Sequence, residues 1–218
     1  MTDWRAFFFD FDGVLADSVE VKTRAFARLF ESYGPEIVAQ VVEYHRRHGG
    51  MTRFDKFRYY YAELLRKPLP EAEMASLNQR FSQLVVDEVV AAPEIAGSVD
   101  FLEKWHAKTP CFVVSAAPEG EVQEIVRRRG LSRYFQEVAG APASKKDNLS
   151  RLLAKHQLAA AGCLFFGDAA SDYWAARDCG VDFLAILPDK EAPLLKLVPE
   201  VNWVNDFTRL GSRLRWED

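Results

Sequence analysis

The chain has 218 residues, of which 49% are hydrophobic and 13% aromatic, enough to bury one substantial core. Its formal net charge of −4 provides no basic surface of the kind that binds nucleic acid, so we expect no nucleic-acid partner. No apolar stretch approaches the roughly 20 residues that cross a bilayer, and Asp10 and Asp12 interrupt the first apolar run too early for a signal peptide.

The first predicted element is a strand at residues 6–9, where Ala6 is followed by three phenylalanines. Such continuous apolarity is typical of a strand that helices cover on both faces, as in a parallel sheet. The strand leads directly into Asp10 and Asp12, and Gly13 comes next. Two carboxylates buried this close together need a cation between them, and a hard, oxygen-liganded metal ion is the simplest candidate.

Residues 17–92 carry a helical pattern, because apolar side chains recur there at intervals of three and four residues. Glycine and proline breaks divide this segment into four predicted helices. The first runs from residue 21 to the break at Gly34-Pro35, and the others cover about 36–48, 52–65 and 71–92.

After Pro93, helices and strands alternate. The predicted strands cover residues 111–115, 137–139, 163–166, 183–187 and 202–204, and the predicted helices cover 98–107, 118–130, 146–156 and 171–179. This alternation predicts an α/β fold with a doubly wound, mostly parallel, Rossmann-like sheet. The sheet domain then comprises residues 1–16 and 93–218, and residues 17–92 form an inserted four-helix domain.

Polar residues follow three of the predicted core strands. They are Asp10 and Asp12 after the first strand, Ser115 at the end of the next, and Asp168 and Asp172 after the strand at 163–166, with Lys145-Lys146 before a helix between them. The carboxyl ends of parallel strands meet at one edge of a sheet, so these side chains should converge there. The cluster offers oxygen ligands for a metal ion and a cation for an anionic substrate.

The segment Asp10-Phe11-Asp12-Gly13-Val14-Leu15-Ala16-Asp17-Ser18 resembles the first motif of the haloacid dehalogenase superfamily. Ser115 matches the second motif, the Lys145 region the third, and Gly167-Asp168-Ala169-Ala170-Ser171-Asp172 the fourth. The helical segment directly after the first motif is similar to the helical cap of phosphoglycolate phosphatases and β-phosphoglucomutases. The resemblance covers nearly the whole chain.

The resemblance implies a role for each matching residue. Asp10 would be the nucleophile and Asp12 the acid–base group; the metal ion would be Mg²⁺, held by Asp10, by the backbone carbonyl of Asp12 and by Asp168. Supporting positions would be Gly13 in the first motif, Asp172, which orients Asp168 and Lys145, and Ser115 with the backbone N–H of Ala116, which hold phosphoryl oxygens. True dehalogenases lack the second aspartate, so Asp12 favours phosphoryl transfer.

Elementary electrostatics supports the same residue types. Unit like charges about 4 Å apart repel by about 4 kcal/mol at an effective dielectric constant of about 20, so a carboxylate attacks a phosphate dianion only if cations offset that charge. Lys145 or Lys146 would supply one of them, and Lys145 fits the spacing of the third motif better.

The predicted cap has a candidate substrate-binding region around Gly49-Gly50-Met51, which His45, His48, Arg53 and Lys56 bracket. Two successive glycines suit a loop that closes over a site. Arg53 could bind a second phosphate or a carboxylate in bidentate fashion, with His48 nearby. The alternative is that Arg53 lies in solvent in the first turn of its helix.

We therefore expect a Mg²⁺-dependent phosphatase that acts on a small phosphorylated metabolite, such as a sugar phosphate or a phosphoglycolate-like acid. A sugar phosphomutase of the β-phosphoglucomutase type is the alternative, and a catalytically idle binding module is a third. The three cysteines lack zinc-ligand spacing, which favours reduced thiols in a cytoplasmic protein. The oligomeric state stays open between monomer and homodimer.

Overall fold

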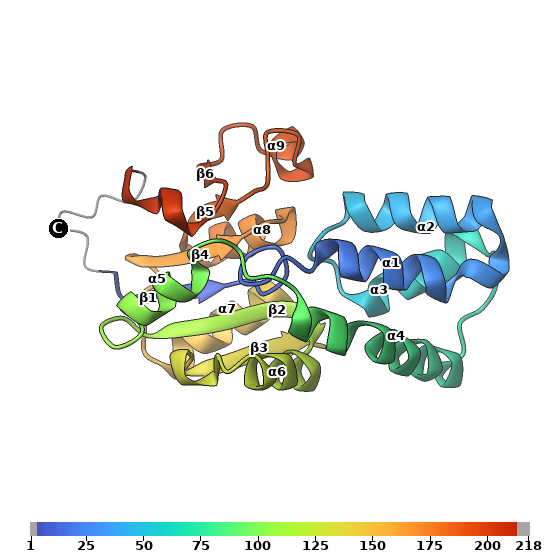
Figure 1. Cartoon of the computed structure of the whole chain (residues 1–218), viewed down its shortest axis with the longest axis horizontal. Helices are drawn as coiled ribbons and strands as arrows, with labels where there is room; N and C mark the ends of the chain where they lie inside the picture. Colours follow the sequence, from blue (N-terminus) through green and yellow to red (C-terminus); the bar gives the residue numbers. More distant parts are fainter. Residues whose placement is uncertain (1–3, 213–218) are drawn as a thin grey trace.

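The computed structural model describes residues 4–212, which form a six-stranded sheet with helices on both faces and a block of helices at one end (Figure 1). The ends of the predicted sheet domain, residues 1–3 and 213–218, lie outside the described residues. No helix in the described part of the chain has the length and apolarity to traverse a bilayer.

All strand pairs in the sheet are parallel, and the strand order is β3-β2-β1-β4-β5-β6. The strands are β1 (Ala6–Phe9), β2 (Cys111–Pro118), β3 (Glu137–Ala141), β4 (Cys163–Gly167), β5 (Asp182–Ile186) and β6 (Trp203–Val204). This order is that of a doubly wound, Rossmann-like sheet, which confirms the predicted fold class.

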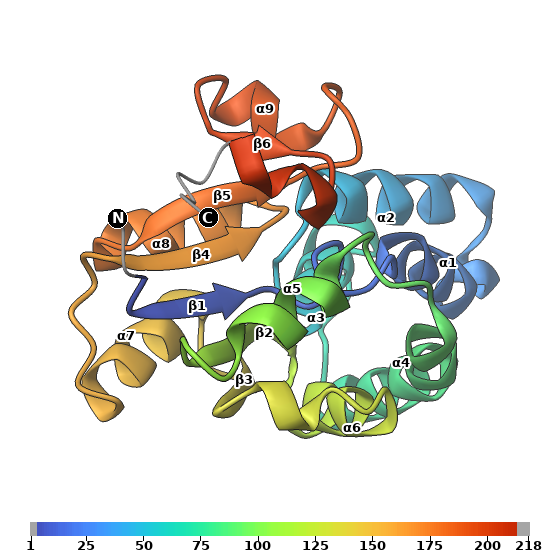
Figure 2. The ribbon, with the colours of Figure 1, turned by 60° about the vertical axis from the view of Figure 1, so that its left-hand side comes forward.

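The side chains of β1 alternate between two apolar layers, which explains why the whole strand is apolar. Phe7 and Phe9 pack into the layer that contains α5 (Ser98–Trp105) and α6 (Glu119–Arg128). Ala6 and Phe8 pack on the opposite face, with α7 (Lys145–Lys155) and α8 (Ala170–Cys179), and Figure 2 shows these two layers of helices on either side of the strands.

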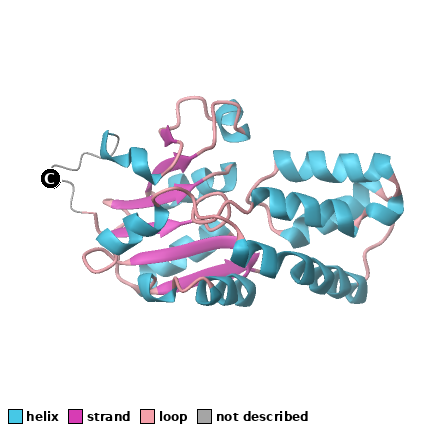
Figure 3. Ribbon diagram, viewed as in Figure 1, coloured by secondary structure: helices cyan, strands magenta, loops and turns pink. Residues whose placement is uncertain are grey.

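Residues 17–92 form the helical block beside the carboxyl edge of the sheet (Figure 3). Its elements are α1 (Val19–Leu29), the 3₁₀ turn η1 (Glu31–Tyr33), α2 (Pro35–Arg47), α3 (Arg53–Tyr59), the π turn η2 (Tyr60–Leu64) and α4 (Glu71–Ala91). Thr52 caps α3 by accepting a hydrogen bond from the backbone N–H of Asp55. In the wider π turn, the consecutive residues Tyr60 and Tyr61 are both buried.

Three features differ from the predicted elements. Strand β2 continues to Pro118, which pairs with Ala141 beyond a register shift, so α6 begins one residue later than expected. The five-residue helix α9 (Pro193–Leu197) was not predicted, because it is too short for its pattern to repeat. The 3₁₀ turns η3 (Ser132–Tyr134) and η4 (Phe207–Ser212) were not predicted either.

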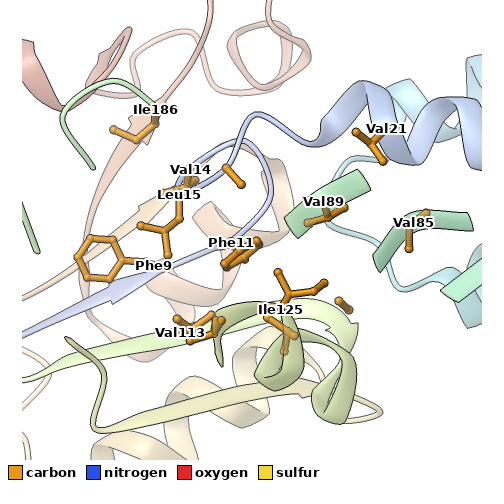
Figure 4. Close-up of a cluster of buried hydrophobic side chains, with 14 of the residues drawn as sticks. Phe9, Phe11, Val14, Leu15, Val21, Val85, Val89, Val113, Ile125 and Ile186 are labelled. Atoms are coloured by element: carbon orange, nitrogen blue, oxygen red, sulfur yellow. The ribbon is translucent and has the colours of Figure 1, made fainter. Parts of the chain in front are cut away.

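One apolar core joins the sheet to the helical block. Figure 4 shows Phe9 and Val113 of the sheet, then Phe11 and Leu15, and beyond them side chains of α1 and α4 such as Val85. Because this core passes beside the end of β1, it fixes the helical block next to the predicted site.

Candidate active site

The candidate site lies where the strand order reverses, between β1 and β4. In open parallel sheets this switch point leaves a crevice at the carboxyl ends of the strands, where ligands bind. Asp10 follows β1, and its backbone N–H donates a 2.9 Å hydrogen bond to the carbonyl of Phe166 in β4. Asp168 directly follows β4. The register of two neighbouring strands thus brings both carboxylates to one place.

Lys145 links two of the site's carboxylates. Its ammonium lies 2.5 Å from Asp10 Oδ2 and 2.5 Å from Asp172 Oδ1, and all three side chains are buried. The other oxygen of Asp10 accepts a 2.6 Å hydrogen bond from the backbone N–H of Phe11. Lys146 instead pairs with Asp178 on the surface, so the structure places Lys145 in the site.

Asp172 serves both the site and its helix. Its Oδ2 accepts a 3.1 Å hydrogen bond from the backbone N–H of Ala169, the residue before α8, while its Oδ1 accepts from Lys145.

The segment after β1 packs closely against Asp168. Gly13 has φ +76°, and a Cβ atom there would lie 2.5 Å from Asp168 Oδ2, so no side chain fits between the two motifs.

Asp10, Asp168 and Asp172 form an acidic cluster in which one carboxylate oxygen of each lies within 4.8 Å of the others. Burial, together with the neighbouring carboxylates Asp172 and Asp12, raises the pKa of Asp10 to about 7 against the pull of Lys145. Burial and the charge of Asp10 likewise raise the pKa of Asp168 well above its ordinary value. One lysine therefore does not neutralise the cluster, and hard oxygen ligands with excess negative charge fit Mg²⁺.

Asp12 faces a different environment from Asp10. One of its oxygens accepts a 2.6 Å hydrogen bond from Ser18 Oγ, and the other pairs with the ammonium of Lys22 in α1. Burial opposes ionisation of Asp12, but Lys22 and Ser18 outweigh burial and lower its pKa. The acidic cluster of Asp10, Asp168 and Asp172 thus does not include the side chain of Asp12.

Ser115 lies on β2, the other neighbour of β1, at the same edge of the sheet. Its side chain is buried, and its Oγ accepts a 3.1 Å hydrogen bond from the backbone N–H of Ala117. Ala116, between them, is half-buried. The strand end beside Asp10 therefore carries one hydroxyl and a run of backbone amides.

The glycine loop of the helical block lies against the acidic cluster. A Cβ atom on Gly49 would be 3.5 Å from Ala169 Cβ, an ordinary contact. A Cβ atom on Gly50, which has φ +73°, would overlap Ser171 Oγ and lie 3.3 Å from Lys145 Nζ. The helical block therefore lies closely over the sheet edge, with Gly50 against Ser171 and Lys145.

Arg53 and His48 do not lie free in this crevice. Arg53 makes a bidentate ion pair with Glu121 of α6 and also donates to Ser82 Oγ at 2.9 Å. Its side chain is 4% exposed, so the alternative of a solvent-facing Arg53 is wrong. His48 stacks on Tyr44, with ring centroids 4.0 Å apart, and its Nδ1 hydrogen-bonds to the Tyr44 carbonyl.

Sequence reasoning missed Lys22 as a partner of Asp12, and it named Lys56 beside the glycine loop without giving it a role. Lys56 is buried on α3, where it lies between Arg53 and Phe57 on the face that packs inward. A lysine on the apolar stripe of a helix was the available signal, because such a position rarely buries a charge without a function.

A sheet of this order with carboxylates and a lysine at its switch point defines an α/β enzyme. Residues 7–186 match the family of haloacid dehalogenase-like hydrolases. The match covers most of the chain, which therefore belongs to this family. The curated relatives described next are phosphatases, and the chain is a phosphoric monoester hydrolase.

Two curated relatives cover most of the chain. The phosphoglycolate phosphatase of Synechococcus elongatus is 27% identical over 192 residues, which span 84% of this chain and 83% of that protein. The phosphoglycolate phosphatase of Aliivibrio fischeri is 28% identical over 188 residues, 82% of each chain.

Among solved structures, the β-phosphoglucomutase of Clostridium difficile matches with a TM-score of 0.76 at 18% identity, over 95% of this chain and 93% of that chain. A phosphoglycolate phosphatase from Haemophilus somnus, described as predicted, matches with a TM-score of 0.73 at 19% identity, over 96% and 97%. These two matches show a shared fold.

Proposed function

We propose that the chain is a Mg²⁺-dependent phosphatase that hydrolyses a small phosphorylated metabolite through an aspartyl-phosphate on Asp10. The observation that carries the proposal is the unequal environment of the two motif aspartates. Asp10 lies in the acidic cluster beside Lys145, where a phosphate and a metal ion would meet. Asp12 is held apart by Lys22 and Ser18.

The proposed reaction has two displacements. An oxygen of ionised Asp10 attacks phosphorus and the bond to the leaving oxygen breaks. The leaving oxygen takes a proton from the hydrogen-bonded pair of Lys22 and Asp12, in which the Lys22 ammonium donates to the Asp12 carboxylate. Asp12 then takes a proton from water, whose oxygen attacks phosphorus and releases phosphate and free Asp10. Ser115, the backbone N–H of Ala116 and Lys145 hold the phosphoryl oxygens through both steps.

Asp10, Asp168 and the backbone of Asp12 would hold Mg²⁺ at this edge of the sheet. A bound Mg²⁺ supplies positive charge that offsets the repulsion between phosphate and carboxylates. Asp172 keeps Lys145 in place by accepting its second hydrogen bond.

Residues 17–92 act in this proposal as a cap domain over a core formed by residues 1–16 and 93–218. The support is the approach of Gly50 to Ser171 and Lys145, which brings the helical block directly over the acidic cluster. A closed cap excludes water other than the attacking molecule. The names of the relatives favour a phosphoglycolate-like acid as substrate.

The test is release of inorganic phosphate by purified protein with Mg²⁺ from a panel of phosphorylated metabolites. Asp10→Asn should abolish turnover without changing the unfolding temperature, and Asp178→Asn, the same change at the exposed partner of Lys146, should leave turnover intact. EDTA should stop the reaction and added Mg²⁺ should restore it.

Three results would count against the proposal. Wild-type activity in Asp10→Asn would exclude the aspartyl-phosphate. Turnover that needs a bisphosphate primer and yields no free phosphate would instead identify a phosphomutase, in which the phosphoryl group passes to a second hydroxyl rather than to water. A protein that turns over no phosphate ester at all would be the idle binding module.

A further inference from the structure

The helical block buries one lysine that has no carboxylate partner. Lys56 on α3 is 2% exposed, and its ammonium contacts Nδ1 of His45 at 2.7 Å. Among residues 4–212, no carboxylate lies within ion-pair distance of it. A buried ammonium without an anion is costly, so the site is complete only when an anion arrives from outside the chain.

His45 does not supply the missing charge. Burial and the neighbouring ammonium of Lys56 lower the pKa of His45 to about 2, so its ring is neutral at any working pH. A neutral ring that accepts a hydrogen bond at Nδ1 carries its proton on Nε2. That Nε2 makes no hydrogen bond of ordinary length in the described part of the chain, although the Val19 backbone is near enough to act on the ring. His45 therefore orients Lys56 without neutralising it.

Lys56 lies near the site from the side of the helical block. Burial lowers the pKa of Lys56, and the charges of Lys22, Asp168 and Lys145, all of which belong to the site described above, also act on that pKa. The ring of Phe26 lies 5.5 Å from the Lys56 ammonium and 4.7 Å from the ring of His45. On α1, Phe26 follows Lys22, the partner of Asp12, by one helical turn, which is roughly 6 Å. Lys56, which lies near Phe26, is therefore about one helical turn farther along the block than Lys22.

Arg53 is not available for the same task. Its guanidinium already has Glu121 as a bidentate partner, whereas Lys56, three residues later, has only a neutral ring. Ser171 Oγ is a further buried atom without a hydrogen-bond partner among the described residues, and it lies on the core side next to Gly50. His45 Nε2 on the helical block and Ser171 Oγ on the core side are thus two buried polar atoms without a hydrogen-bond partner among the described residues.

We propose that Lys56, oriented by His45, binds a second anionic group of the substrate, a carboxylate or a second phosphate, on the leaving group beyond the scissile phosphate. This inference rests on the proposed phosphatase function and names its substrate class, a small monoester with an anionic leaving group. Lys56 is then the specificity-determining residue of the cap.

The test compares phosphate esters that differ only in the second charge. 2-Phosphoglycolate is compared with 2-hydroxyethyl phosphate, and propane-1,3-diol bisphosphate with 3-hydroxypropyl phosphate, so that the two pairs distinguish a carboxylate from a phosphate. The wild type should prefer the charged member of at least one pair. Lys56→Met should lower kcat/KM for that member roughly 10- to 100-fold, the effect of one charge-assisted hydrogen bond, and leave the neutral member unchanged.

Two further variants separate binding from structure. Lys67→Met removes an exposed lysine of the same helical block and should change neither substrate. His45→Leu should raise KM for the charged member, whereas His45→Gln, which keeps an acceptor for Lys56, should preserve it. Thermal unfolding of each variant shows whether it folds, and Met in place of a buried ammonium should fold at least as well as Lys.

Three outcomes would overturn the inference. The first is a wild type without preference for the charged member of either pair. The second is an equal loss for charged and neutral members in Lys56→Met, and the third is no loss at all. In each of these the phosphatase function stands, provided that p-nitrophenyl phosphate is hydrolysed. If no ester, p-nitrophenyl phosphate included, is hydrolysed, the proposed function fails as well.

Discussion

Asp10 and Asp12 are two residues apart, yet their environments give them opposite pKa shifts. Burial beside other carboxylates raises the pKa of Asp10, while Lys22 and Ser18 lower that of Asp12. In the proposed reaction, the lowered pKa keeps Asp12 ionised, so that it can accept a proton from water. Asp10 must lose its proton before it attacks phosphorus, and positive charge beside it, from Lys145 and from a bound Mg²⁺, would favour that loss.

A substitution at Gly13 tests how tightly the segment after β1 packs against Asp168. Gly13→Ala should reduce turnover at least about 100-fold, because its Cβ atom would displace the Asp168 carboxylate. Gly34→Ala is the matched control. Gly34 has φ +93°, so alanine is strained at both positions, but no atom lies within 4 Å of its added Cβ. Steady-state kinetics should show the loss only in Gly13→Ala; similar losses in both variants would contradict the packing argument.

The buried charge of Lys56 should also be visible in the pH dependence of stability. Burial, reinforced by Lys22, lowers the pKa of Lys56 from 10.5 to about 7. Between these values the unfolded chain binds more protons than the folded chain, so the stabilisation that depends on this group rises with pH. The stabilisation is full above the unfolded pKa and is lost as the pH falls through the folded pKa.

Urea unfolding of the wild type and of Lys56→Met measures this effect, because all other titrations cancel in the difference. From pH 7 to pH 9, the unfolding free energy of the wild type should rise relative to that of Lys56→Met. Below about pH 6, the difference between the two should not change with pH. Parallel curves over the whole range would show that Lys56 keeps an ordinary pKa.

At the scale of elements, the loop between α2 and α3 decides how closely the helical block approaches the sheet. Gly50→Ala should lower kcat/KM by about 10- to 100-fold, because the new Cβ atom would overlap Ser171 Oγ and crowd Lys145. Gly49→Ala, one residue earlier, should keep a kcat/KM close to that of the wild type, since its Cβ atom meets only an ordinary contact with Ala169. Equal kinetics in the two variants would mean that this closed approach is not needed for turnover.

The strands that build the site could be predicted because their burial is a local property of the sequence. Strands β1 and β4 are apolar at every position, and the residues that follow them reach the site through parallel register alone. The extension of β2 to Pro118 depends on pairing with Ala141, and no local pattern reports such a contact.

The candidate site was predictable to the same extent. Asp10, Asp168 and Lys145 could be placed together because each follows or precedes a core element at a fixed spacing. The buried ion pair of Arg53 could not be predicted, because its partner Glu121 lies 68 residues away in another helix. A pattern that repeats every few residues gives no information about ion pairs between residues of different elements.

At the scale of the whole molecule, a shared apolar core and the buried Arg53–Glu121 ion pair bind the helical block to the sheet domain. The core passes from Phe11 to α1 and α4, as Figure 4 shows. The ion pair joins Arg53 of the helical block to Glu121 of α6, and both side chains are less than a tenth exposed. The Arg53 guanidinium also packs on Phe81 of α4, and its Cζ atom lies 4.4 Å from the centroid of the Phe81 ring.

This ion pair predicts a large and specific loss of stability. Glu121→Gln should lower the unfolding free energy by about 3 kcal/mol or more, because it leaves the Arg53 guanidinium buried without a counter-charge. The double variant Arg53→Met/Glu121→Leu should recover most of that loss, since it removes both charges together. Glu88→Gln, which breaks the exposed pair with Arg24, should cost less than about 1 kcal/mol.

Urea unfolding of these proteins and of the single variants Arg53→Met and Glu121→Leu decides whether the pair holds the helical block closed as well as folded. If the double variant loses less than the sum of its two single variants, Arg53 and Glu121 act on each other rather than through separate neighbours. If Glu121→Gln costs no more than Glu88→Gln, the pair is not desolvated in solution and the block opens there. In that case Arg53 would be released to compete with Lys56 for the substrate, and Glu121→Gln should then lower KM for an anionic ester.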